Sequence, residues 1–266
     1  LLPLLRGDID VFTTFEGAFV LARATGDPTH VRAQLGHLRR YLELLLQAPR
    51  PADAWQLTAS PVPSPTAFVE PEGCWEPPDD YTLLWVNGGL FNARTVAMLD
   101  RAQALYAAQG GTLDLRLAIT QGSYTGGALA ASFGTHDGGG AVDLSVRSPV
   151  DWSVQTDEIE PMLRALRVAG FAAWLRAEDE LYPGSVIHIH AIAIGDAELS
   201  EAARAQIDGT FGYLRGYDGL PQINGVPIPD RYGGPVICRW MIARGFQDMR
   251  GWPNPLPTPG GTAQAV

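Results

Sequence analysis

Residues 134–143 read Gly-Thr-His-Asp-Gly-Gly-Gly-Ala-Val-Asp, and this stretch decides how the middle of the chain can fold. Three consecutive glycines, residues 138–140, allow the backbone to leave His136 in a tight turn, because glycine has no Cβ to clash. The apolar run at 141–146 then predicts a strand that carries Asp143. A histidine and an aspartate are therefore expected to converge from one hairpin-like arm.

A second segment, Val186 to Ile194, alternates histidine with apolar residues and predicts another strand. Successive side chains of a strand point to opposite faces, so His188 and His190 are expected on the same face. The chain has five histidines, and three of them fall in this central region. Each of these histidines on its own would fit an ordinary turn position or a solvated strand position. Because three of them fall close together, they indicate a metal site.

Histidine and aspartate are common zinc ligands, and a catalytic zinc site usually has three protein ligands and one position for water or substrate. His136, Asp143 and His190 supply such a set. We therefore expect one Zn²⁺ per chain, held by these residues.

The rest of the chain predicts further strands and helices around these segments. Apolar runs between Gly- or Pro-rich turns indicate strands, and apolar residues at helical spacing indicate helices. Strands are expected at 115–120, 141–146, 171–176 and 186–194, and helices at 28–47, 92–109, 158–169 and 198–213. Connections too short for right-handed crossovers favour antiparallel pairing. The fold class is α+β: a small antiparallel sheet of about four strands with helices on one side, an N-terminal helix and Pro/Gly-rich extensions.

Segments rich in proline and glycine divide the chain into three parts. Residues 1–80 are expected to form an N-terminal helix and a linker or packing arm, residues 81–217 the metal-binding core, and residues 218–266 an extension. Two cysteines, Cys74 and Cys238, suit either a single disulfide in an oxidising compartment or two free thiols.

Charge and hydropathy exclude two classes of partner. A formal charge of -10 and a pI near 4.9 repel phosphate backbones, so nucleic acid is not expected as a partner. The apolar runs fall short of the roughly 20 residues that cross a bilayer, so no membrane span is expected. The chain begins at Leu1, which suggests a mature or trimmed product whose targeting signal has been lost.

The segment around His136 and Asp143, with the sequence HIH ending at His190, resembles the superfamily that joins lysostaphin-type endopeptidases, D-Ala-D-Ala metallopeptidases and the hedgehog signalling domain. In that superfamily an Asp closes a Gly-Ala-x-Asp stretch seven positions after a His, and a final His follows downstream, as here. The likeness covers roughly residues 90–200. It implies a zinc peptidase with His136, Asp143 and His190 as ligands, in which zinc-bound water attacks a carbonyl.

The resemblance also implies how protons are moved. The carboxypeptidase branch has a Glu or Asp three residues before the last His, and this chain has Ile187 there. In lysostaphin-like relatives the first His of the HxH segment serves instead, which assigns His188 as the proton-transfer residue. Glu180, in the loop before the strand, is the reserve candidate.

Four residues are candidates for contact with substrate. The carboxypeptidase branch has an arginine in an SGYR-like stretch, where this chain has Gln121-Gly-Ser-Tyr-Thr125 and no arginine. Gln121 or Tyr124 is expected to donate a hydrogen bond to a developing oxyanion, or else to be an ordinary turn residue. Ser132 is displaced by two positions from the Ser of the superfamily. Trp174 either lines a groove or belongs to the core.

The function implied is zinc-dependent hydrolysis of peptide bonds in bacterial peptidoglycan, by a carboxypeptidase or an endopeptidase, outside the cell or in the cell envelope. Its partner would be a peptidoglycan stem peptide or cross-link. The alternative is a non-catalytic, zinc-stabilised, hedgehog-like domain that binds a cell-wall or protein partner. A third reading is a metal-free carbohydrate-binding or scaffold domain. A structural zinc ion would have a fourth protein ligand, whereas a catalytic zinc ion would not. The number of protein ligands therefore distinguishes the binding domain from the hydrolase.

Overall fold

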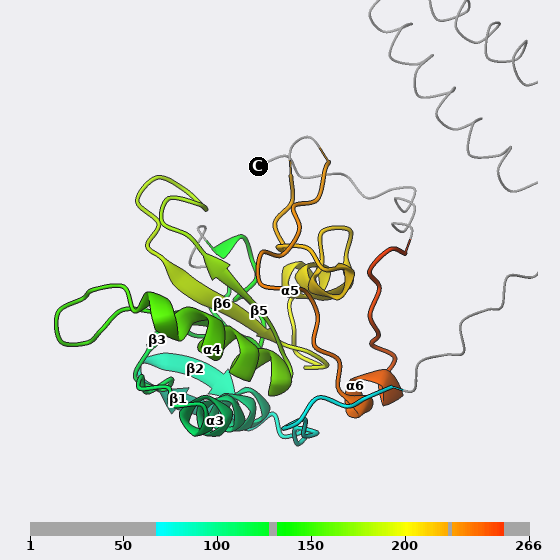
Figure 1. Cartoon of the computed structure of the whole chain (residues 1–266), viewed down its shortest axis with the longest axis horizontal. Helices are drawn as coiled ribbons and strands as arrows, with labels where there is room; N and C mark the ends of the chain where they lie inside the picture. The colour runs from blue at the N-terminus through cyan, green and yellow to red at the C-terminus, as the bar shows by residue number, and fades with distance from the viewer. Residues whose placement is uncertain (1–67, 128–131, 223–224, 253–266) are drawn as a thin grey trace, which may run out of the picture. The chain divides into compact units, whose positions relative to one another are not determined.

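The computed structural model describes residues 68–127, 132–222 and 225–252 (Figure 1). The helix predicted at 28–47 and most of the predicted N-terminal arm lie outside the described residues. Among the helices that the structure describes, none combines the length and the apolar character needed to cross a bilayer.

The centre of the fold is a four-stranded sheet in which every neighbouring pair is antiparallel. The strands lie in the order β3 (Ile119–Gln121), β4 (Ala141–Ser145), β6 (His188–Ala193) and β5 (Phe171–Arg176). The predicted α+β class and the antiparallel sheet of four strands are confirmed. A separate hairpin of β1 (Leu83–Val86) and β2 (Gly89–Asn92) precedes the sheet, and the sequence analysis missed it.

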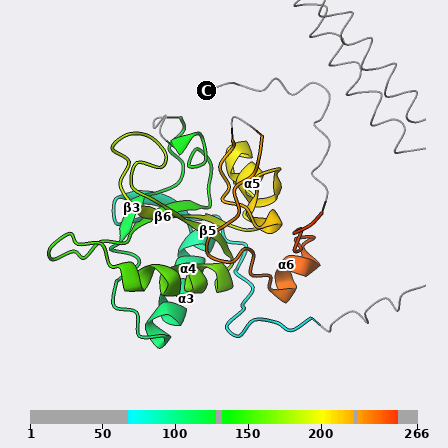
Figure 2. The ribbon, with the colours of Figure 1, turned by 45° about the horizontal axis from the view of Figure 1, so that its top comes forward.

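Helices cover both faces of this sheet, which corrects the expectation that they lie on one side. Strands β4, β5 and β6 share a core on one face with α3 (Ala93–Ala108) and α4 (Thr156–Val168). On the opposite face α5 (Glu201–Asp208) and the 3-10 helix Tyr213–Arg215 pack on other strand residues (Figure 2). That second face is apolar at Ala141, Ala172 and Ile192, so it needs a cover of its own.

Two predicted elements have different bounds in the structure. The strand expected at 115–120 is confined to β3, because Asp114 closes a turn by accepting hydrogen bonds from the backbone N–H groups of Arg116 and Leu117. The helix expected at 198–213 ends at Asp208 and is followed by Gly209 and the 3-10 helix. It also starts later than expected, at Glu201, because Ser200 accepts a hydrogen bond from Ala203 N as the N-cap.

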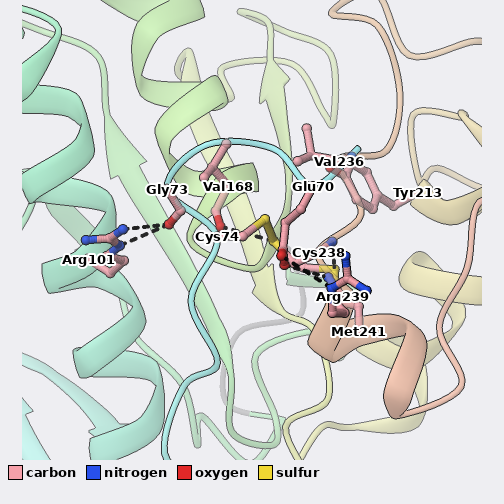
Figure 3. The surroundings of a disulfide bond; sticks show 10 residues. All are labelled: Glu70, Gly73, Cys74, Arg101, Val168, Tyr213, Val236, Cys238, Arg239 and Met241. Carbon is pink, nitrogen blue, oxygen red and sulfur yellow. Dashed lines mark hydrogen bonds and ion pairs between the residues drawn. A yellow bond between two sulfur atoms is a disulfide. The ribbon is translucent and has the colours of Figure 1, made fainter. Parts of the chain in front are cut away.

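Segments on either side of the core are fastened to it by covalent and ionic contacts. Cys74 and Cys238 form a disulfide at the start of α6 (Arg239–Ala243), which resolves the two alternatives for the cysteines (Figure 3). Arg94 of α3 pairs with Asp79, and Arg167 of α4 pairs with Asp230. Residues 68–80 and the described part of 218–252 therefore pack against the sheet and its helices.

Candidate metal centre

Strand register places a row of polar and aromatic residues across one face of the sheet. Asp143 of β4 lies opposite His190 of β6, with Gln121 of β3 beside Asp143 and Trp174 of β5 beside His190. Directly paired residues of antiparallel strands share a face, so these four side chains point the same way. The face is the one covered in part by α5.

His136 reaches this row from the loop before β4. The His136 carbonyl accepts a hydrogen bond from Thr125 N at 2.9 Å, and Gly139 N donates to the Glu198 carbonyl at 2.7 Å. The backbone approach is so close that a Cβ on Gly138 would lie 2.3 Å from the Glu198 oxygen. The glycine run therefore does what the sequence analysis expected: it lets the chain turn tightly between His136 and the strand.

The three predicted ligands converge in the structure. His190 Nδ1 lies 2.7 Å from Asp143 Oδ1, and His136 Nε2 lies 3.3 Å both from that oxygen and from His190 Nδ1. All three residues are buried. His136, Asp143 and His190 thus form a group that could hold a metal ion, and no fourth Cys, His, Asp or Glu of the described residues joins it.

Hydrogen bonds to neighbouring residues determine which nitrogen of the His136 and His190 rings faces the other members of the group. His136 Nδ1 donates to the Gly122 carbonyl at 2.8 Å, and His190 Nε2 donates to Gln206 Oε1 at 3.0 Å. In the neutral rings the inward nitrogens therefore carry lone pairs. Two nitrogen lone pairs and a carboxylate oxygen then meet without a donor among them, which is the arrangement that a cation completes.

The charges of the group suit cation binding. Burial raises the pKa of the Asp143 carboxyl, but the two neighbouring imidazoles outweigh this and hold it well below its usual range, so the carboxylate is ionised. Burial lowers the pKa of His190 to about 4, so this ring is neutral at pH 7. Burial acts to lower the pKa of His136, but the protonated ring donates a hydrogen bond to Asp143 and is attracted by its charge, and these effects raise the pKa overall.

We expect Gln206→Leu to weaken the binding of a divalent metal ion, with zinc as the test ion, about 10- to 100-fold, because partners that orient a metal ligand contribute this much to affinity. The change removes the oxygen that accepts from His190 Nε2. Competition with a zinc-binding dye would measure the affinity. Gln206→Glu keeps an acceptor and is the matched control; equal zinc affinity in the Leu variant and the wild type would contradict the role of Gln206.

His188 lies next to the group without belonging to it. Its Nδ1 donates to the Val186 carbonyl at 2.8 Å, so in the neutral ring Nε2 carries the lone pair. His188 Nε2 faces Asp143 Oδ2 at 3.8 Å. The ring thus presents a proton-accepting nitrogen toward the metal-binding residues from the neighbouring row of the same face.

A pocket of about 220 Å³ opens over the group. His136, Asp143, His188 and His190 line it, together with the predicted residues Gln121 and Ser132, which are joined by a hydrogen bond of 2.5 Å. Exposed apolar side chains stand at its edge: Phe133, Tyr182 and Val186. The pocket therefore combines polar groups at the metal-binding residues with an apolar rim, as small-molecule and peptide sites commonly do.

Three predicted site residues lie elsewhere. Tyr124 bonds to Asn92 and Glu198 and lines a neighbouring pocket. Glu180 accepts from the backbone N–H of Ala177 and lines a different pocket. Trp174 is 2% exposed and stacks behind the His190 ring, with centroids 6.1 Å apart, so it supports the ligand from the core. The structure does not bring these three side chains into the pocket at the metal-binding group.

Sequence reasoning missed Gln206, the Gly122 carbonyl and Arg176, which also lines the pocket. Strand register supplies the only signal for Arg176, because it ends β5 directly opposite His188 of β6. Gln206 lies 16 residues from His190, on another element, and no local pattern marks it.

No protein-family model, no curated protein and no solved structure matches this chain.

Proposed function

We propose that this protein is a zinc-dependent hydrolase of peptide bonds in bacterial peptidoglycan. The observation that carries the proposal is a buried group of three residues able to hold a metal ion, which lines a pocket and has His188 beside it. No fourth Cys, His, Asp or Glu of the described residues belongs to this group. Catalytic zinc sites have this composition, whereas structural zinc sites are closed by four protein ligands. The peptidoglycan substrate rests on the resemblance of residues 134–143 and 186–190 to the superfamily named above.

The donor set fits zinc in kind, and two of its three ligand-atom separations fit in spacing. Imidazole nitrogen and carboxylate oxygen are typical zinc ligands, and a tetrahedron with bonds of about 2.1 Å places its ligand atoms about 3.4 Å apart. Two of the three separations here are 3.3 Å, and the third is 2.7 Å. His136 Nε2, Asp143 Oδ1 and His190 Nδ1 would hold the ion.

Bound zinc would supply Lewis acidity toward a substrate carbonyl and lower the pKa of water. The protein's own residues do the rest. His188 Nε2 accepts the proton of the attacking water and delivers a proton to the departing amine. Gln121, held by Ser132 at the pocket wall, is the donor placed to bond the substrate. Phe133 and Tyr182 are exposed apolar side chains at the rim that a bound peptide would contact.

The proposed location is outside the cell or in the cell envelope. A disulfide between Cys74 and Cys238 is typical of an oxidising compartment and supports this location. Peptidoglycan is found in the same place, so location and substrate agree.

We expect His188→Ala to keep its zinc and to lose hydrolysis by about 100- to 10,000-fold, the usual contribution of a general acid–base residue. The assay is the appearance of new amino groups in zinc-loaded digests of purified peptidoglycan stem peptides, followed by mass spectrometry. Zinc content and melting temperature of the variant provide the control. Full activity in a zinc-replete His188→Ala protein would contradict the role of His188.

The second candidate is the non-catalytic zinc-stabilised binding domain, and one observation favours it: position 187, where the carboxypeptidase branch has its acidic base, is Ile187. A zinc-loaded wild type that binds peptidoglycan fragments but releases no amino groups from them would establish this candidate and reject the hydrolase.

A further inference from the structure

A second pocket, of about 350 Å³, adjoins the metal-binding pocket and has no role in the scheme above. The two pockets share Thr120 and Gln121 as lining residues. The second pocket is lined by the turn of the β1–β2 hairpin and by residues 119–125, which include Tyr124, expected from the sequence to contact substrate. A ligand that fills this pocket would therefore lie next to a ligand at the metal-binding group.

Strand register and close backbone packing build this second pocket. Trp85 of β1 lies opposite Leu90 of β2, and Leu90 in turn bridges to Ser123. Paired residues of antiparallel strands share a face, so these three form one row. Gly122 and Gly89 also line the pocket and pack backbone against backbone, since a Cβ on Gly122 would lie 2.8 Å from the Gly89 Cα. At these two positions no side chain fills the space.

Trp85 supplies an aromatic surface to the second pocket. The residue is 74% exposed, whereas tryptophan is on average a highly buried residue. An indole at the boundary with water stacks well on a ligand that has a flat apolar face and polar edges. A sugar ring is built in this way, with C–H groups on its face and hydroxyl groups around its edge.

The lining of the second pocket carries no charge. It consists of aromatic, aliphatic, glycine, hydroxyl and amide residues, and no described residue of the lining is Asp, Glu, Lys, Arg or His. The chain as a whole has a formal charge of -10, so this neutrality is a local feature. An ionised ligand would lose water here without gaining a counter-charge, which is costly. An uncharged ligand is therefore favoured.

The polar side chains of this lining offer acceptors. Asn87 donates both of its amide hydrogens to backbone carbonyls, at 3.0 and 3.2 Å. Thr120 donates its hydroxyl hydrogen to a carbonyl of β4 at 3.2 Å, and Thr125 donates to the Asp137 carboxylate at 3.0 Å. The oxygens of the three donating side chains keep lone pairs. A sugar offers several hydroxyl donors to such oxygens, whereas a peptide backbone offers one N–H per residue and an ionised carboxylate offers none.

We propose that the second pocket binds one uncharged sugar ring of the peptidoglycan glycan strand, stacked on Trp85, while the attached stem peptide enters the metal-binding pocket. The identity of the glycan rests on the proposed function, but binding of the sugar needs neither zinc nor hydrolysis. Trp85 is then a residue that determines specificity, because it favours stem peptides that are still attached to glycan over free ones.

The test is calorimetric titration of zinc-free protein with the trimer of N-acetylglucosamine, an uncharged oligosaccharide. We expect saturable binding by the wild type and at least about 10-fold weaker binding by Trp85→Ala, because the change removes the stacking surface. Trp85→Phe should keep part of the affinity. Trp152→Ala is the matched control, since Trp152 is 70% exposed and does not line the pocket, and it should bind like the wild type. Melting temperatures check that each variant is folded.

Several outcomes would overturn the proposal. Absence of saturable binding by the wild type would do so, as would equal affinities of the wild type and Trp85→Ala, or an equal loss in Trp152→Ala. If Trp85→Ala weakens binding of a free stem peptide and the trimer does not bind, the pocket takes peptide and the proposal is wrong. Trp85-dependent sugar binding by a zinc-loaded protein that cleaves no peptide would reject the hydrolase and keep the sugar site; cleavage without sugar binding would do the reverse.

Discussion

Replacing His136 or His190 by alanine is expected to abolish zinc binding, with bound zinc falling from about one ion per chain to background. Each change removes one of three ligand atoms that lie within 4.8 Å of one another. Loss of a residue that only hydrogen-bonds to a metal ligand lowers metal affinity about 10- to 100-fold. Loss of the ligand itself is therefore expected to lower the affinity further. The measurement is metal content by mass spectrometry after zinc loading and dialysis.

His188→Ala is the matched control for this experiment, since it removes an imidazole from the same strand and face without removing a ligand. It should retain about one zinc per chain. Zinc retained by both ligand variants, or lost equally from the His188 variant, would contradict the assignment of the ligand group. A wild type that takes up no zinc from an excess would reject the metal centre and the hydrolase together.

Of the changes proposed for this protein, removal of the disulfide between Cys74 and Cys238 is expected to cause the largest loss of stability. The double variant Cys74→Ser, Cys238→Ser should lose about 2–5 kcal/mol in the free energy of unfolding, because the bond restricts the unfolded chain over a long loop. The two cysteines are 164 residues apart, and Cys238 is fully buried against the Val168 carbonyl. The measurement is urea denaturation of both proteins at equal concentration.

Reduction of the wild type provides an independent control, since it should shift the urea midpoint toward that of the double variant. A single Cys74→Ser change should give the same loss as the double variant. Equal unfolding midpoints of the oxidised wild type and the double variant would contradict a stabilising disulfide. Figure 3 shows why an effect is expected: the bond ties the segment that contacts Arg101 to the first residues of α6.

Local sequence pattern was enough to find the three residues that could hold a metal ion. The glycine run, the strand that follows it and the alternation in His188-Ile-His190 are all properties of short segments, and each restricts where its own side chains point. The strand at 171–176 and the helix near 92–109 were equally readable, because their apolar periodicity is strong. Short elements with little periodicity, such as the hairpin of β1 and β2, were not found.

The residues that surround His136, Asp143 and His190 could not be predicted from local sequence pattern. Sequence distance placed Glu180 near the site, but its carboxylate turns to the Ala177 N–H within its own loop. Trp174 occupies the row of Asp143 and His190, yet the cover over that face buries it. In both cases the deciding contact depends on how a loop folds or on what covers the sheet, and the local pattern contains neither.

The sequence by itself determined the fold class, the strand that carries His188 and His190, and the three residues that converge as a group able to hold a metal ion. The tertiary structure alone decided that α5 brings Gln206 to His190, that the Gly122 carbonyl sets the His136 ring, and that Arg176 lies beside His188. The physical reason is the separation along the sequence of the residues that interact. Backbone conformation and side-chain alternation are fixed by neighbours in sequence, whereas register and covering contacts join residues that only the folded core brings together.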